Sequence, residues 1–259
     1  MRVAIDGTYF GVLPGLDTER LIRLAVDSGA DGLNWPLHEA FGSANAPRVA
    51  RQLADAGQSA VTLGLTSHTS AVPGLEHEFR DHLVRALDAA QALGTRILDA
   101  WPRRPQEVAK NVAQDTLRAN LEFALPLLQQ ANCTLSIEFE PDATLERYAE
   151  TLDFLVHYAP HVKITADTYH IVRIGDHLPD AACLLGRDHL GVVHLSASHR
   201  GEPGSAGDTC DYAGFLCAAV NAGYAGDAVL QYQPKGEALA SLKRAIVLTR
   251  GLIAGIVKH

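Results

Sequence analysis

The chain has 259 residues, of which 47% are hydrophobic and 20% charged, enough apolar material for one large core or two small ones. Its formal charge of −8 comes from 30 acidic and 22 basic residues without long runs of one sign, which argues against a nucleic-acid binder or a polybasic membrane binder. We therefore expect a small-molecule partner.

Short apolar runs alternate along the chain with longer segments of helical period, and Gly, Pro, Asp or Asn marks each switch. The predicted strands are Val3–Asp6, Gly32–Trp35, Ala60–Leu65, Arg96–Ala100, Thr134–Glu140, Val162–Asp167, Gly191–Leu195 and Ala228–Tyr232. The predicted helices lie near residues 18–28, 46–56, 75–93, 106–131, 144–158, 178–187, 211–222 and 236–257. Glycines at several helix ends support these boundaries, and Pro126 predicts a kink or a break in the fourth helix.

This regular alternation, with no linker and no change of composition, predicts an α/β fold in which residues 1–259 form a single-domain (β/α)8 TIM barrel. A doubly wound open sheet is the alternative. The glycine-dense stretch "RGEPGSAGDT" follows the seventh strand, not the first, and lacks the GxGxxG spacing. A dinucleotide site is therefore not indicated.

Polar side chains end four consecutive predicted strands. They are Glu138 and Glu140 on the fifth strand, Asp167 on the sixth, His194 on the seventh, and Gln231 and Gln233 on the eighth. In a barrel of this kind the strand ends form the active site, and alternate residues of a strand share a face. Such a set predicts a divalent metal. Its oxygen-rich character favours manganese, magnesium or cobalt over a structural zinc. Manganese is therefore the first candidate, and magnesium, cobalt or zinc are the alternatives.

Each of these residues also has an ordinary structural role open to it. Asp167 could cap the helix that follows it, and His194 could be a hydrogen-bonded interior histidine. Glu138 is harder to explain in this way, because a carboxylate after an apolar run needs a cation, a metal or hydrogen-bond donors. The coincidence on adjacent strands favours the metal site.

The segments "CTLSIEFEP", "ITADTYH", "VVHLSASHRGEPGSAG" and "GYAGDAVLQYQPK", in this order and spacing, resemble the sugar phosphate isomerase/epimerase family of xylose isomerase-like TIM barrels, which also includes endonuclease IV relatives. The resemblance covers most of the chain. It implies metal ligands at Glu138, Asp167, His194 and Gln231, and substrate contacts at His170 and Arg200.

The chain departs from the family pattern at three positions. Gln231 stands where the family usually has Glu, and an amide can offer oxygen to a metal but cannot take up a proton. Two-base epimerisation therefore lacks its second glutamate, and only Glu138 remains of the pair. Asn34 replaces a frequent Glu, and Ala197 replaces a frequent Asp.

These features together predict a metal-dependent isomerase or epimerase of a ketose or polyol, which abstracts a proton next to a carbonyl through a metal-bound enediolate. Glu138 and His170 are the candidate bases, and the substrate-binding residues are expected to include His170, Arg200, His68, Trp101 and Glu140. His68 could instead be a solvated loop residue or itself act as the base, Trp101 could stack on a sugar, and Glu140 could turn inward or pair with an arginine.

Two other functions fit the same residues. One is a lyase of the same fold, a dehydratase or a C-glycoside-cleaving subunit that eliminates a β-substituent from a keto substrate. The other is a non-catalytic sugar-binding or accessory subunit, and a homo-oligomer or a partner subunit is compatible with either. Nuclease activity is disfavoured by the acidic balance.

The four cysteines form no CxxC pair, which fits a reducing compartment and indicates neither a zinc knuckle nor a disulfide framework. The opening "MRVAIDGTYF" has too short an apolar run for a signal peptide, and no segment reaches the roughly 18 apolar residues of a membrane helix. We expect a cytoplasmic protein without nucleic-acid or membrane partners.

Overall fold

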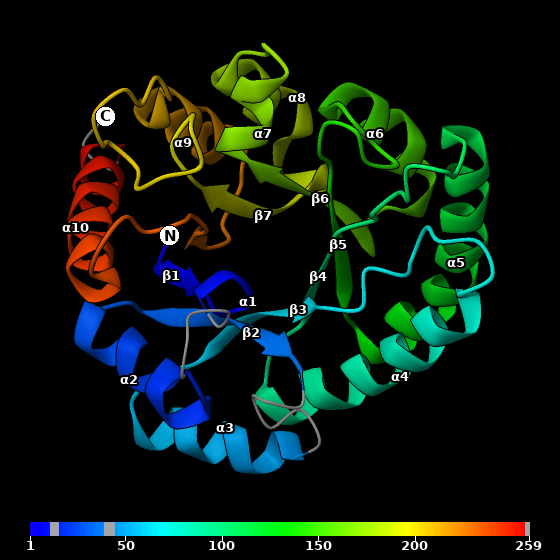
Figure 1. The fold of residues 1–259 in the computed structure, drawn as a ribbon, viewed down its shortest axis with the longest axis horizontal. Helices are drawn as coiled ribbons and strands as arrows, with labels where there is room; N and C mark the ends of the chain where they lie inside the picture. The colour runs from blue at the N-terminus through cyan, green and yellow to red at the C-terminus, as the bar shows by residue number, and fades with distance from the viewer. Residues whose placement is uncertain (11–15, 39–44, 257–259) are drawn as a thin grey trace.

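A closed barrel of parallel strands forms the centre of the molecule in a computed structural model that describes residues 1–10, 16–38 and 45–256. The strands pair in chain order from β1 to β8, and β8 pairs with β1. Helices surround the barrel on its outside (Figure 1). The structure confirms the predicted single-domain (β/α)8 TIM barrel and excludes the open sheet.

The strands lie close to their predicted positions. They are β1 (Val3–Asp6), β2 (Gly32–Leu37), β3 (Ala60–Leu65), β4 (Ile97–Ala100), β5 (Thr134–Glu138), β6 (Val162–Asp167), β7 (Leu190–Leu195) and β8 (Ala228–Leu230). β5 ends two residues earlier than predicted because the backbone turns there, and the amide of Glu140 donates to the carbonyl of Leu145 at 3.0 Å.

The helices α2 to α6 and α8 to α10 cover the barrel and correspond to the predicted helices. Two further helices, α1 and α7, are short and were not predicted. The helices are α1 (Gly7–Phe10), α2 (Thr18–Ser28), α3 (Ala46–Asp55), α4 (Glu76–Leu93), α5 (Lys110–Ala131), α6 (Tyr148–Leu155), α7 (Thr168–Arg173), α8 (Leu178–His189), α9 (Tyr212–Asn221) and α10 (Ala238–Ile256), with a 3-10 turn at Val156–Tyr158. The short ones, α1 and α7, each begin directly after an aspartate that ends a strand.

The helix prediction differs from the structure at the starts of two helices and at Pro126, and one predicted end cannot be compared. α5 and α6 begin four residues later than expected, because Arg104 ties the preceding loops together by donating to the carbonyls of Ala143 (3.1 Å) and Val108 (3.3 Å). α5 continues through Pro126 without the break that was one predicted outcome. The predicted end of the last helix at residue 257 lies outside the described residues.

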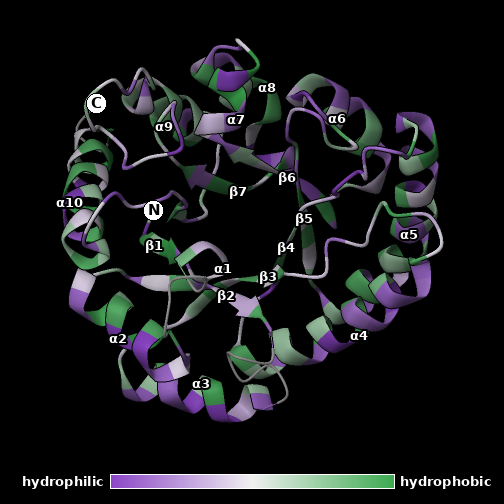
Figure 2. Cartoon of the chain, viewed as in Figure 1, coloured by the Kyte–Doolittle hydropathy of each residue, from purple (hydrophilic) through white to green (hydrophobic). Residues whose placement is uncertain are grey.

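Apolar side chains fill the space between the strands and the helices, and Figure 2 shows apolar residues along the strands and polar ones on the outer helix surfaces. A separate small cluster of Ala4, Val61, Val192 and Val229, with Ile97 against it, fills the inside of the barrel. The positions that follow these inner residues on their strands therefore determine what the barrel mouth contains.

Within the described residues, no helix is both long and apolar enough to cross a membrane.

Candidate active site

A layer of buried polar side chains lies at the carboxyl ends of the strands, and four of its members follow a residue of the inner apolar cluster at a spacing of two, which places them on the same face of their strands. It comprises Asp6 at the end of β1, Asp99 on β4, Glu138 on β5, Asp167 on β6, His194 on β7 and Gln231 after β8. None of these residues is more than 7% exposed. The strand ends therefore gather the predicted residues Glu138, Asp167, His194 and Gln231, together with two aspartates that the sequence analysis did not select.

Glu138, Asp167 and His194 form a group that could hold a metal ion. One ligand atom from each lies within 4.8 Å of the others. The Oε1 atom of Glu138 and both ring nitrogens of His194 are buried without a hydrogen-bond partner, so His194 is not a hydrogen-bonded interior histidine in this structure. Unpartnered buried groups of this kind are costly, and a divalent cation would supply the missing partner of Oε1 of Glu138 and of one ring nitrogen of His194. The residues present therefore fit a metal.

His194 lies between two carboxylates. Its Nε2 is 3.4 Å from Oδ2 of Asp99, and its Nδ1 is 3.5 Å from Oε1 of Glu138. Burial opposes the charged imidazolium, but Asp99 and then Glu138 outweigh it and raise the pKa of His194 to about 10. Burial also raises the pKa of Asp99 to about 7. Asp99 is further fixed by Thr165, whose hydroxyl donates to its Oδ1 at 2.6 Å.

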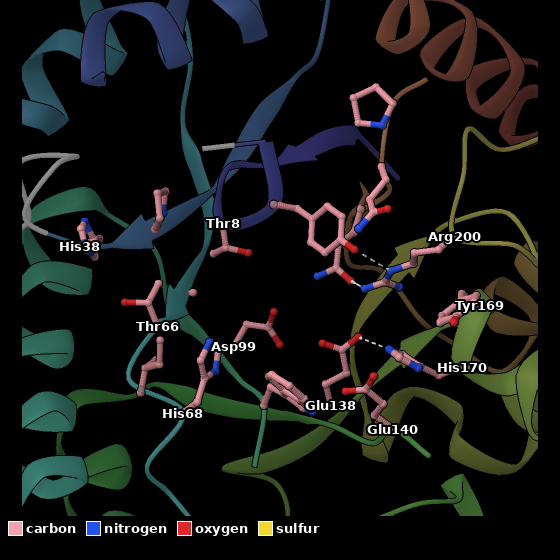
Figure 3. A pocket seen from close by; sticks show the side chains of 18 of the residues that line it. Thr8, His38, Thr66, His68, Asp99, Glu138, Glu140, Tyr169, His170 and Arg200 are labelled. Carbon is pink, nitrogen blue, oxygen red and sulfur yellow. Dashed lines mark hydrogen bonds and ion pairs between the residues drawn. The ribbon is translucent and has the colours of Figure 1, made fainter. Parts of the chain in front are cut away.

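Asp167 caps a helix and also belongs to the group that could hold a metal ion. Its Oδ1 accepts from the amide of Tyr169 at 2.8 Å and caps α7, while its Oδ2 faces the cluster. This cap starts the short helix that carries His170, whose Nε2 lies 3.6 Å from Oε1 of Glu138 (Figure 3). Burial lowers the pKa of His170 to about 4, so its imidazole is neutral near pH 7.

Arg200 inserts its guanidinium among the polar side chains. It donates to Oδ2 of Asp167, to Oε1 of Gln231 at 2.6 Å and to the hydroxyl of Tyr9 at 3.2 Å. The guanidinium carbon also lies 4.9 Å and 5.1 Å from the ring centres of Tyr9 and Tyr169. Burial opposes the charge of Arg200, but Asp167 outweighs it and raises the pKa of Arg200. The only positively charged residue that lines the cavity in the described part of the chain is thus held by a carboxylate.

A cavity of about 1130 Å³ opens above the polar layer. Its lining includes predicted substrate contacts, with His68 on one side and His170 and Arg200 on the other (Figure 3). Trp101 also lines the cavity, and its ring centre is 5.0 Å from that of His68. Glu140 lines the cavity as well. Its carboxylate is 3.9 Å from Arg173, so it both turns inward and approaches an arginine.

The charge states of the outer residues follow from their surroundings. Burial, with a smaller contribution from Glu138, raises the pKa of Glu140 to about 7. Burial and then Arg103 lower the pKa of His68. The Nδ1 atom of His68 is buried and unpartnered, which does not match a fully solvated loop residue. Neutral imidazoles therefore lie on both sides of the cavity.

Two of the departures from the family pattern lie at or near this layer. Asn34 is buried, and its Nδ2 donates to Oδ2 of Asp99 at 3.4 Å. A carboxylate at this position would face Asp99, so the amide suits its neighbour. Ala197 is fully buried, and its amide donates to the carbonyl of Gly201 at 3.0 Å in the loop that carries Arg200.

Asp6 and Asp99 are the residues of the layer that the sequence analysis missed. The signal was present: each ends or nearly ends a predicted strand, in "VAID" and "RILDA". Each also follows an inner apolar residue, Ala4 or Ile97, at a spacing of two. Applying the strand-end criterion to every strand, and not only to the last four, would have found both.

Comparisons with known proteins agree with this fold. The sequence model of the xylose isomerase-like TIM barrel family matches residues 22–248. The hydroxypyruvate isomerase of Escherichia coli (strain K12) is 28% identical over 182 residues, which cover 67% of this chain and 69% of that protein.

Solved structures show the same fold at low identity. An L-ribulose 3-epimerase superposes with a TM-score of 0.84 at 19% identity, covering 99% of this chain and 96% of the other. A 3-keto-D-glucoside 4-epimerase from E. coli gives 0.84 at 16% identity, covering 97% and 99%. A family 2 AP endonuclease from Brucella melitensis gives 0.80 at 21% identity, covering 93% and 96%.

Proposed function

Since the chain belongs to the xylose isomerase-like TIM barrel family, we propose that it is a divalent-metal-dependent isomerase or epimerase of a small sugar or polyol. The observation that carries the proposal is the buried group of Glu138, Asp167 and His194, with the Oε1 of Glu138 unpartnered beside a large cavity. The similarity to a hydroxypyruvate isomerase and the shared fold with sugar epimerases support it.

The cation would be held by Glu138, Asp167 and His194, with the amide oxygen of Gln231 as the fourth ligand. A divalent cation in this place would polarise the carbonyl group of the substrate and make the hydrogen on the neighbouring carbon more acidic. Manganese is our first candidate, and magnesium, cobalt and zinc follow, because the ligands are carboxylate, imidazole and amide groups.

Glu138 is the base in this proposal. It removes the proton from the hydroxyl-bearing carbon, the electron pair of that C–H bond forms a carbon–carbon double bond, and the former carbonyl oxygen takes up the proton of the hydroxyl group. Return of the first proton to the former carbonyl carbon completes the isomerisation without an oxidant or a reductant. Neutral His170, 3.6 Å from Glu138, would donate or accept a hydrogen bond at a substrate oxygen.

The charges around the cavity favour an uncharged substrate. Five carboxylates lie in or beside it: Asp6, Asp99, Glu138, Glu140 and Asp167. Among the described residues that line the cavity, Arg200 is the single Lys or Arg, and it is held by Asp167. The undescribed residues 11–15 and 39–44 contain no Lys or Arg in their sequence. A phosphate group would therefore find, among the lining residues that the structure describes, no Lys or Arg that is not already held by a carboxylate.

Two alternative functions remain tied to the same residues. A lyase needs the same first step, removal of the proton by Glu138, followed by loss of a β-substituent in place of reprotonation. An accessory sugar-binding subunit would hold the ligand without exchanging its protons. Both can be distinguished by following the hydrogen on the reacting carbon.

The test is solvent deuterium uptake, measured by NMR with Mn²⁺ and a panel of free ketoses, cyclitols, 3-keto sugars and hydroxypyruvate. Isomerisation places deuterium in a product with the same atoms as the substrate, whereas elimination releases a fragment or water. Glu138→Gln should abolish uptake, and the exposed Glu107→Gln should leave it unchanged. Absence of uptake with every compound, despite bound ligand, would contradict the enzyme assignment and favour the accessory subunit.

A further inference from the structure

The amide of Gln231 is fixed from both sides. Its Nε2 donates to Oδ2 of Asp6 at 2.6 Å, and its Oε1 accepts from Nη2 of Arg200 at 2.6 Å. The other oxygen of Asp6 accepts from the amide and hydroxyl of Thr8, at 2.7 and 2.6 Å, and from the amide of Tyr9 at 3.3 Å. Both oxygens of Asp6 thus serve as acceptors, as in an ionised carboxylate.

An acceptor at position 6 requires a donor at position 231. A glutamate there would bring two carboxylate oxygens to within hydrogen-bond distance, at positions that are 0% and 5% exposed. Burying two like charges in contact is strongly unfavourable unless one is protonated. The amide avoids this conflict, because it donates to Asp6 and still turns its oxygen toward Arg200.

We infer that Asp6 and Gln231 are a coupled pair, in which Asp6 is a positioning residue that fixes the Gln231 amide with its oxygen on Arg200, which also binds Asp167 of the cation-binding cluster, and excludes an acid–base group from this wall of the site. The pair joins β1 to the residue after β8, where the barrel closes. The unusual amide at position 231 is thus explained by a residue 225 positions away in the sequence.

The functional part of this inference rests on the proposed function and narrows it. Groups able to exchange a proton line the cavity from the end of β2 to α7, namely His38, His68, Asp99, Glu138, Glu140 and His170. In the described part of the chain, the wall made by the β7 loop, β8 and α1 lines the cavity with residues that include Tyr9, Arg200 and Gln231, and with no carboxylate or imidazole. Inversion at one carbon needs a second base on the opposite face, and this wall supplies none, so the geometry favours proton transfer between adjacent carbons, or elimination, with Glu138 as the base.

The experiment is a double-mutant cycle with Asp6→Asn, Gln231→Glu and the two combined. Thermal midpoints without metal report the coupling, and Mn²⁺ titration of the folded proteins reports the position of the amide oxygen. Gln106→Glu is the matched control, because it makes the same chemical change at an exposed residue that does not line the cavity.

Each single variant should lower the thermal midpoint by roughly 5–10 °C. Gln231→Glu places a second carboxylate against Asp6, and Asp6→Asn either places its NH2 group against that of Gln231 or forces one of the two amides to turn. The double variant should recover most of this loss, since an asparagine can donate to a glutamate. Asp6→Asn should also weaken Mn²⁺ binding roughly tenfold, with recovery in the double variant, an effect that loss of packing alone would not reverse. Gln106→Glu should change neither measurement.

Gln231→Glu with wild-type stability, or a double variant whose loss equals the sum of the single losses, would overturn the pair. Thermal coupling without Mn²⁺ binding in any of the proteins would support the pair and overturn the proposed metal-dependent function instead. The two failures are therefore distinguishable.

Discussion

Asp99→Asn should weaken metal binding without removing a ligand. In the structure Asp99 faces Nε2 of His194 at 3.4 Å, on the opposite side of the ring from Glu138. A carboxylate there can accept a hydrogen bond from Nε2, so once a cation takes the place of the proton on Nδ1, Asp99 would keep the remaining proton of His194 on Nε2 and leave the lone pair of Nδ1 for the cation. The asparagine would keep its oxygen toward Thr165, which donates to Oδ1 of Asp99 at 2.6 Å, and would present its NH2 group to His194.

The imidazole would then carry its proton on Nδ1, the nitrogen that faces the cluster. Loss of such an outer carboxylate commonly costs 10- to 100-fold in metal affinity, or about 1.4–2.7 kcal/mol. Titration with Mn²⁺, followed by the electron paramagnetic resonance of the free ion, measures this directly at fixed pH. Asp115→Asn, at an exposed carboxylate on α5, is the control and should bind as the wild type does. Wild-type affinity in Asp99→Asn, in a protein where His194→Ala loses binding, would refute the role given to Asp99.

Three further predictions concern packing, pH and substrate. Gly64→Ala should lower the free energy of unfolding by roughly 1–3 kcal/mol in chemical denaturation, because the added Cβ would lie 3.2 Å from the Asn34 side chain and clash with Cγ2 of Thr8. A free energy of unfolding equal to that of the wild type would show that these neighbours move away without cost. Burial and then Arg85 lower the pKa of His82 to about 4, so the unfolded chain binds this proton at higher pH and the unfolding free energy should fall as pH drops from about 6.5 to 4; His82→Gln should flatten this slope, and an unchanged slope would contradict it. Free ketoses should exchange deuterium at least tenfold faster than their phosphates, and a preference for the phosphates would refute the charge argument.

The barrel was predictable because its signals are local. Each strand is a short apolar run bounded by turn residues, and the helices carry an amphipathic period, so the order of elements could be read directly. The glycines after α2 and α4, Gly29 and Gly94, adopt the left-handed φ values of 81° and 73° that the chain needs to leave a helix. The short helices α1 and α7 escaped prediction because a segment of four or six residues has no measurable period.

The candidate site was predictable only in part. Glu138, Asp167 and His194 could be selected because they end neighbouring strands, where proximity follows from chain order. The contact of Asp6 with Gln231 depends on closure between β1 and β8, and that of Asp99 with His194 crosses the barrel between strands that are not neighbours. Such contacts depend on the tilt and stagger of the strands, which no local pattern encodes.

The most direct test of the proposed function is the metal content of protein purified without added metal or a histidine tag, combined with Mn²⁺ titration of the wild type and His194→Ala. The proposal predicts about one equivalent of a divalent cation in the wild type, or one saturable Mn²⁺ site, and its loss in His194→Ala. If neither protein binds Mn²⁺ even at roughly millimolar concentration, the buried group is not a metal site, and the metal-dependent isomerase assignment is wrong.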